Sequence, residues 1–151
     1  MRKAFKFRLY PTRQQEQAMA RILETHRFLY EQRKVAWQEH GRSVFYLQQA
    51  ADWTRVRADT DFLAVTNFSS CQATLRRLDK AFQAFFRRCK AGEKPGYPRF
   101  KGRNRFDTVE FPSYGDGCKL DGNRVLRLSC IGRLRARSRL CPSNVKRTVG
   151  M

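Results

Sequence analysis

Acidic side chains are scarce in this sequence of 151 residues. Asp and Glu together number 13, against 32 Lys and Arg, so the formal net charge is +19. This excess argues against a cationic partner and favours a polyanion. We expect nucleic acid, because neutralisation of phosphates by Lys and Arg supplies most sequence-independent binding energy. A membrane surface is the lesser alternative, and a charge that serves only solubility is the other.

The few acidic side chains are unevenly distributed. Residues 1–74 hold 12 basic and 7 acidic residues, a balance of +5, whereas residues 75–151 hold 20 and 6, a balance of +14. The second part of the chain is therefore expected to meet most of a polyanionic partner.

The sequence also lacks the paired cysteines of a metal site and the apolar runs of a membrane protein. His26 and His40 have no CxxC pair at ligand spacing, and no apolar run reaches signal-peptide or transmembrane length. We therefore expect the chain to bind no metal ion, cofactor or small-molecule substrate and not to associate with a membrane. The odd number of cysteines without CxxC spacing predicts a reduced, cytoplasmic setting, nucleoid-associated if DNA is bound. The cysteines are Cys71, Cys89, Cys118, Cys130 and Cys141.

Apolar and basic side chains alternate at the start of the chain. In KAFKFRLYP, residues 3–11, this alternation predicts a half-buried strand with Lys6 and Arg8 on its basic face. The following TRQQ is typical of a capping box, in which Thr12 and Gln15 satisfy each other's backbone amides at a helix start.

Helical spacing follows in two segments. The first helix is predicted to run to about Gly41, and His26 falls on its apolar face, where a core histidine is a better interpretation than a catalytic one. Its other apolar positions are Met19, Ile22, Leu23, Leu29 and Tyr30. A second helix is predicted from Tyr46 to Arg57, with packing candidates Leu47, Ala50, Ala51 and Trp53.

The clearest helix is predicted to begin at Ser69 or Ser70 and to end at Gly92. Its apolar face comprises Cys71, Leu75, Leu78, Phe82, Phe85 and Cys89. The opposite face comprises Arg76, Arg77, Lys80, Gln83, Arg87 and Arg88, with the single acid Asp79 among them. Because so many cations repel one another unless an anion arrives, binding is favoured over simple solvation.

The segment KAGEKPGYPRFKGRNRF, residues 90–106, can form neither a regular helix nor a core strand. Pro95 and Pro98 hold the backbone extended, and Gly96 permits another chain to approach closely. Tyr97 or Phe100 could stack on a base or anchor the segment to the core, and both interpretations stay open. The expected phosphate contacts are Lys94, Arg99, Lys101, Arg103 and Arg105.

The remaining sequence favours strands. TVEFP, residues 108–112, alternates, and residues 121–123 of CKLDGNRVLRLS are typical of a hairpin turn. In a strand, Arg133, Arg135, Arg137 and Arg139 would share one face. The order of these elements, a strand followed by helices and then by strands, predicts an α+β fold in which a helical lobe interrupts a small barrel or sheet.

Four stretches in this order carry a family resemblance: KAFKFRLYPTRQQEQ, RFLYEQ, LRRLDKAFQAFFRRCKAGEKPGYPRFK and DGNRVLRL. Together they resemble the N-terminal region of the TnpB/OrfB family of transposon-encoded, transposase-like proteins. The resemblance implies a helix-turn-helix region over residues 1–45 and a helical recognition lobe over residues 12–106. It also implies an OB-like wedge barrel split between residues 1–11 and 107–151, with its last strands incomplete.

By the same resemblance, these parts bind a guide-type RNA and target DNA, while a RuvC-like nuclease domain and a zinc finger follow. The matched region ends before those domains, so the chain is expected to be a truncated, non-enzymatic member in transposition or DNA recombination. Its acids Asp107, Glu110, Asp116 and Asp121 are not expected to converge on a catalytic site. The alternative is a stand-alone nucleic-acid-binding regulator or RNA chaperone.

Family members also read a short DNA motif beside the target, and the resemblance carries that role onto Gln72 and Tyr46. A Gln amide can form paired hydrogen bonds with adenine in the major groove, and an ordinary exposed polar residue is the alternative. The residues predicted to bind nucleic acid are Lys6, Arg8, Tyr46, Gln72, Arg76, Arg77, Lys80, Arg87, Arg88, Lys94, Tyr97, Arg99, Lys101, Arg103 and Arg105.

Overall fold

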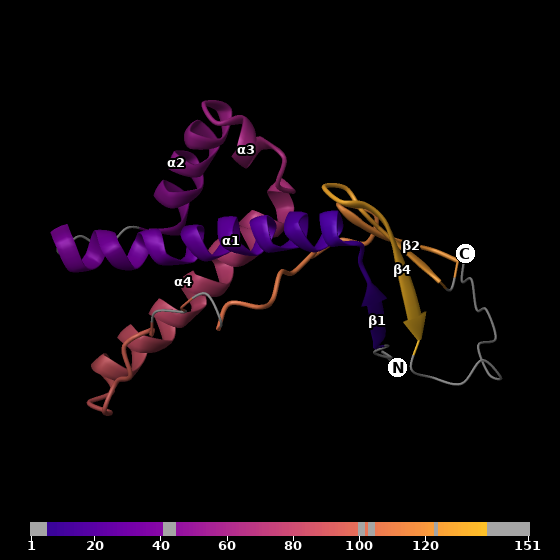
Figure 1. Cartoon of the computed structure of the whole chain (residues 1–151). Coiled ribbons are helices and arrows are strands. Elements are labelled where there is room, and N and C mark those ends of the chain that lie inside the picture. Colours follow the sequence, from indigo (N-terminus) through magenta and orange to yellow (C-terminus); the bar gives the residue numbers. More distant parts are fainter. Residues whose placement is uncertain (1–5, 41–44, 100–101, 103–104, 123, 139–151) are drawn as a thin grey trace, which may run out of the picture.

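A computed structural model describes residues 6–40, 45–99, 102, 105–122 and 124–138. A lobe of helices lies beside a small antiparallel sheet, which confirms the predicted α+β class (Figure 1). The helices are α1 (Arg13–His40), α2 (Tyr46–Ala58), α3 (Asp61–Ala64) and α4 (Phe68–Lys90). The strands are β1 (Phe7–Tyr10), β2 (Cys118–Asp121), β3 (Val125–Leu128) and β4 (Gly132–Ser138).

The capping box at the start of α1 is confirmed. The Gln15 amide donates to Thr12 Oγ1 over 3.4 Å, and the Thr12 amide donates to Gln15 Oε1 over 3.0 Å. Gln15 Nε2 also donates to the Arg133 carbonyl oxygen of β4 over 2.9 Å. One side chain therefore starts the helix and ties it to the sheet.

Two apolar clusters hold the helices together, and α4 packs against both α1 and α2. Leu29, Trp53, Leu63, Cys71 and Leu75 form the first cluster. Tyr30, Leu78, Phe82 and Phe106 form the second. Burial confirms the predicted core positions Leu29 and Tyr30 of α1 and Cys71, Leu75, Leu78 and Phe82 of α4, whereas Met19, Ile22 and Leu23 are half-buried.

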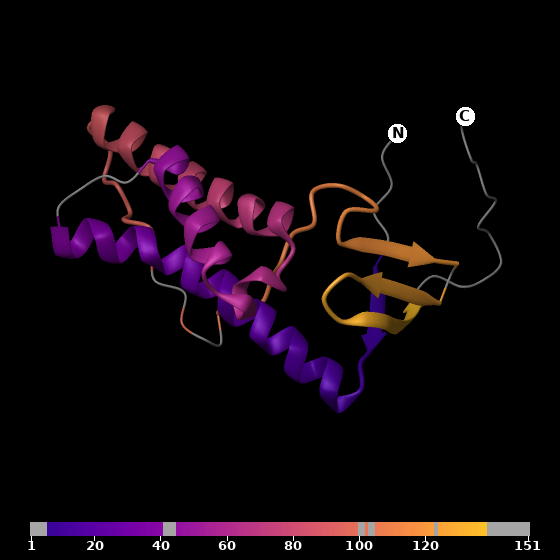
Figure 2. The same cartoon turned by 90° about the horizontal axis from the view of Figure 1, so that it is seen from above.

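Other predicted packing positions on α2 and α4 are wrong or only partly right. Leu47 is 76% exposed and Ala51 is exposed, because the face of α2 that packs carries Ala50 and Trp53 instead. Cys89 is exposed and Phe85 only half-buried. Both lie on the last turns of α4, which extend away from α1 and from the sheet (Figures 1 and 2).

Each end of α4 has an identifiable cap. Asn67 caps the start, so the helix begins at Phe68, one or two residues before the prediction, and the Asn67 side chain accepts from the Ser70 amide over 2.9 Å. At the other end, the predicted Gly92 has φ +70. The Gly92 amide donates to the Cys89 carbonyl oxygen and the Glu93 amide donates to that of Arg88. These two bonds form a Schellman motif, which explains why the helix stops at Lys90.

His26 confirms its predicted place in the core, where it is 0% exposed between α1 and α4. Its Nδ1 lies 2.8 Å from Thr74 Oγ1, and its Nε2 lies 3.3 Å from Ser70 Oγ. The Ser70 hydroxyl donates to the Asn67 carbonyl oxygen, so it accepts from Nε2, and Nδ1 accepts from Thr74. Burial, followed by the nearby Arg77 guanidinium, lowers the pKa of His26 from 6.5 to about 4.

The sheet has the strand order β1-β4-β3-β2 with antiparallel neighbours throughout. The predicted hairpin at residues 121–123 joins β2 to β3, and the N-terminal strand pairs with β4. Within the described chain the sheet is open, so the OB-like barrel is not confirmed. The strand predicted at residues 108–112 is wrong, because this stretch connects the lobe to the sheet without a paired neighbour (Figure 2).

Side chains and backbone groups join the sheet to the lobe at the start of α4. Asn67 Nδ2 donates to Asp116 Oδ1 over 3.0 Å. Gly117, with φ +80, passes so close to Asn67 that a Cβ atom there would lie 2.6 Å from Nδ2. Hydrogen bonds from Ser69 and Asn67 lower the pKa of the exposed Asp116 carboxyl. The N-cap of α4 and the segment that leads into β2 are thus in direct contact, and we call this contact the joint between α4 and β2.

No helix among the described residues combines the length and the apolar character needed to cross a membrane.

Candidate nucleic-acid interface

One exposed face of α4 carries most of the predicted contacts. We define the α4 stripe as Gln72, Arg76, Lys80, Gln83, Arg87 and Lys90, spaced three or four residues apart. This spacing keeps all six on one face of a helix. The buried side of α4 is formed by the two apolar clusters, so packing turns the stripe toward solvent. Arg76, Lys80 and Arg87 are exposed, as predicted.

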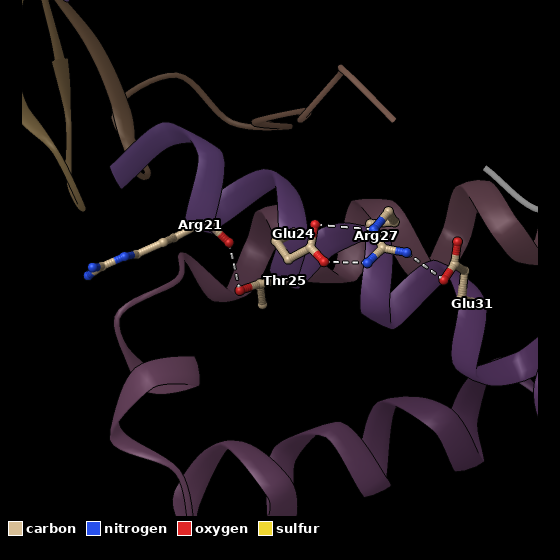
Figure 3. Close-up of polar contacts among 5 residues, drawn as sticks. All are labelled: Arg21, Glu24, Thr25, Arg27 and Glu31. Carbon is tan, nitrogen blue, oxygen red and sulfur yellow. Dashed lines mark hydrogen bonds and ion pairs between the residues drawn. The ribbon is translucent and has the colours of Figure 1, made fainter. Parts of the chain in front are cut away.

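The cations of the α4 stripe differ from Arg27 of α1 in their partners. On α1, Arg27 forms ion pairs with Glu24 and with Glu31, the latter over 2.9 Å (Figure 3). Among the described residues, Lys80 and Arg87 form no ion pair. Because an exposed cation without a carboxylate partner is free to neutralise a phosphate, this row of cations on one helix face suits a polyanion.

The two residues predicted to read a DNA motif lie in contact. The Tyr46 hydroxyl, at the start of α2, donates to Gln72 Oε1 on the first turns of α4. Arg76 Nε donates to the same hydroxyl over 3.3 Å, and its guanidinium carbon lies 6.0 Å from the Tyr46 ring centroid. The hydroxyl thus orients both an amide and a guanidinium, the two groups that most often contact bases in grooves.

Arg77 does not lie on the exposed face as predicted. Its guanidinium carbon lies 5.1 Å from the Phe106 ring centroid and 5.9 Å from that of Tyr30, and the residue is half-buried. These are cation–π distances. Arg77 therefore closes the core over Phe106, although helical spacing alone puts it beside Arg76.

The basic segment after α4 has no regular structure over its described residues, as predicted. Tyr97 contacts Phe82 and Phe85 edge to face, with ring centroids 5.9 and 5.4 Å apart. Of the two interpretations left open, anchoring to the core agrees with this contact. Phe106 is a second, unpredicted anchor, 3% exposed. A Cβ atom at Gly96 would meet no described atom within 4 Å, so no close approach of another segment explains this glycine.

The cations of this segment lie on either side of its anchors. Lys94, Arg99 and Arg105 are exposed, as is Arg88 on the last turn of α4. Lys101, Arg103 and Phe100 lie outside the described residues, so their predicted contacts remain predictions.

A second basic surface lies on the sheet. Strand register places Arg8, Lys119, Arg127, Arg133, Arg135 and Arg137 on one face, and we call this set the basic sheet face. All six are exposed, whereas Leu134 and Ala136 of β4 are buried on the other face. Arg139 lies outside the described residues, and Lys6, just before β1, is exposed.

Lys119 and Arg127 were missed as candidates from the sequence. A single strand shows only which of its own residues share a face, and the alignment of faces between strands depends on pairing. The hairpin turn was a usable signal, because it fixes the register that sets Lys119 opposite Arg127.

The predicted site thus falls into separate groups. The structure brings together Tyr46, Gln72 and Arg76, and continues them along α4 through Lys80 and Arg87. Arg8 belongs to the sheet, at the other end of the molecule from the last turn of α4 (Figures 1 and 2). Across the described part of the chain, no three His, Cys, Asp or Glu side chains gather closely enough to hold a metal ion.

Comparison with known sequences adds two findings. Residues 1–42 match a family described as a helix-turn-helix domain. The chain is 32% identical over 143 residues to a protein of Escherichia coli (strain K12), and 32% identical over 111 residues to one of Streptomyces pristinaespiralis. These alignments cover 89% and 70% of this chain.

Both relatives carry the name "Putative RNA-guided DNA endonuclease", with the designation InsQ for the Escherichia coli protein. The present chain spans 33% of the length of the Escherichia coli protein and 26% of that of the Streptomyces protein.

Proposed function

We propose that this chain, a member of the TnpB/OrfB family by its N-terminal sequence, binds nucleic acid through the α4 stripe. The supporting observation is the row of exposed cations on α4, which begins at the Tyr46–Gln72–Arg76 contact. The ligands that we propose are DNA and a guide-type RNA, as the names of the relatives suggest. The nuclease activity in those names is not part of the proposal.

Phosphate contacts are assigned to the cations of the stripe. Arg76, Lys80 and Arg87 succeed one another along the exposed face of one rigid helix. A helix holds such cations at fixed spacing, so they can follow one nucleic-acid strand without a loop having to be ordered first. These contacts give affinity and orientation but no sequence preference.

Base contacts are assigned to the start of the stripe. Gln72 Oε1 accepts from Tyr46, and an amide oxygen keeps a second lone pair for another donor. A Gln side chain in this state can still pair with adenine, by accepting at Oε1 and donating from Nε2. The Tyr46 hydroxyl limits the rotation of the amide, and this restriction lowers the entropy cost of such a contact.

The proposal is tested with two variants of equal charge. Replacing Arg76, Lys80 and Arg87 by Gln lowers the net charge of +19 by three, and so does replacing the exposed Arg13, Arg21 and Arg55. Fluorescence anisotropy with a labelled duplex measures the dissociation constant of each. We expect the stripe variant to bind at least about tenfold more weakly, and the control variant to bind nearly as well as the unaltered chain.

Circular dichroism checks that both variants fold, which their exposed positions favour. Equal weakening in the two variants would show that total charge, and not the α4 stripe, determines binding. Unchanged binding in both would remove the proposed function.

A further inference from the structure

The basic sheet face contains cations set directly opposite one another. Arg8 lies opposite Arg137, and Arg127 lies opposite both Lys119 and Arg133. Side chains so placed have Cβ atoms about 5 Å apart, and like charges at that separation destabilise a sheet. Strand pairing also places Asp121 on this face, and it is the one acidic residue there among the described strands.

Among the described residues, none of these six cations forms an ion pair. The ion pairs between described residues are those of Arg27, on α1. The six cations and one acid leave a surplus of five positive charges on a small surface. A bound polyanion would relieve this repulsion, so the arrangement suits a phosphate backbone.

An aromatic ring lies among these cations. Tyr10 is 47% exposed and pairs with Arg135 of the neighbouring strand β4. The Arg8 guanidinium carbon lies 5.6 Å from the Tyr10 ring centroid, a cation–π contact that holds the ring on this face. Exposed rings on a positively charged sheet are the surfaces on which unpaired bases stack.

We infer that the basic sheet face binds single-stranded nucleic acid, with Tyr10 stacking on one base and the flanking arginines contacting phosphates. A duplex offers this ring no base to stack on, because the faces of its bases are already stacked on one another inside the helix. This inference rests on the proposed function for the class of ligand, but it assigns a separate surface and an unpaired strand.

The test uses a labelled single strand of roughly 12 thymidines and a duplex of the same length, measured against the full chain. We expect Tyr10→Leu to weaken single-strand binding by about tenfold and to leave duplex binding unchanged. Tyr10→Phe, which keeps the ring, should bind as the unaltered chain does. Replacing Arg135 and Arg137 by Gln should weaken single-strand binding and reduce its salt dependence.

A second measurement, the fluorescence of a base analogue, reports stacking directly and not only affinity. A 2-aminopurine placed in the single strand should lose fluorescence on binding the unaltered chain, because stacking on Tyr10 quenches it. Quenching that persists in Tyr10→Leu, or equal losses on single strand and duplex, would overturn the inference.

The stripe variant of α4 separates this inference from the proposed function. If the variant with Arg76, Lys80 and Arg87 replaced by Gln binds duplex more weakly but binds the single strand as before, the proposed function and the inference both stand. If it abolishes both, the sheet binds nothing by itself and the inference is wrong. If it changes neither, the proposed function fails, and the Tyr10 variants still decide the inference.

Discussion

His26 is held neutral between α1 and α4, by burial and by two hydroxyl partners. Its pKa in the folded chain, about 4, is lower than the ordinary 6.5 of an unfolded chain, so the unfolded state takes up the proton first as the pH falls. We expect the free energy of unfolding to be insensitive to His26 above pH 6.5 and to decrease from there to about pH 4. The total loss should be about 3 kcal/mol.

Urea unfolding at a series of pH values measures this decrease, and His26→Leu is its control. The variant should be less stable near neutral pH, because the Ser70 and Thr74 hydroxyls lose their buried partner. Its stability should nevertheless fall less steeply between pH 6.5 and 4. Equal slopes for the two proteins would mean that other groups cause the acid sensitivity.

At the scale of elements, the joint between α4 and β2 depends on a glycine. Gly117 has φ +80, and a Cβ atom there would lie 2.6 Å from the Asn67 amide nitrogen. We expect Gly117→Ala to lower the free energy of unfolding by about 1–3 kcal/mol, from backbone strain and the displaced cap. Thermal or urea unfolding measures the loss.

Gly96→Ala is the matched substitution, because Gly96 is exposed and a Cβ atom there would meet no described atom within 4 Å. It should change stability little, or raise it slightly by restricting the unfolded chain. A Gly117→Ala protein as stable as Gly96→Ala would show that the joint tolerates a side chain.

Capping residues and the spacing of apolar side chains predicted a helix or strand correctly where both indicated the same element. The Thr12–Gln15 box and Gly92 marked helix ends correctly, since capping depends on neighbouring residues alone. The prediction of a strand at residues 108–112 was wrong, because alternation of apolar and polar side chains does not show whether a partner strand is available. Arg77 was misplaced for a related reason, since its ring partners come from other parts of the chain.

At the scale of the whole molecule, the net charge predicts a negatively charged partner but does not locate the surfaces that would contact it. The cations behind the balance of +14 over residues 75–151 include those on α4, in the following segment and on the sheet. Helical spacing was enough to group those of α4. Pairing between strands, absent from any local pattern, was needed to unite Arg8 with Arg137 and Lys119 with Arg127.

The central claim is that the cations of the α4 stripe contact phosphates, and the salt dependence of duplex binding measures such contacts most directly. Each phosphate contact adds about 0.9 to the slope of log K against log salt. The account predicts a slope about 3 units shallower for Arg76, Lys80 and Arg87→Gln, and an unchanged slope for Arg13, Arg21 and Arg55→Gln. The same slope in the unaltered chain and both variants would contradict it.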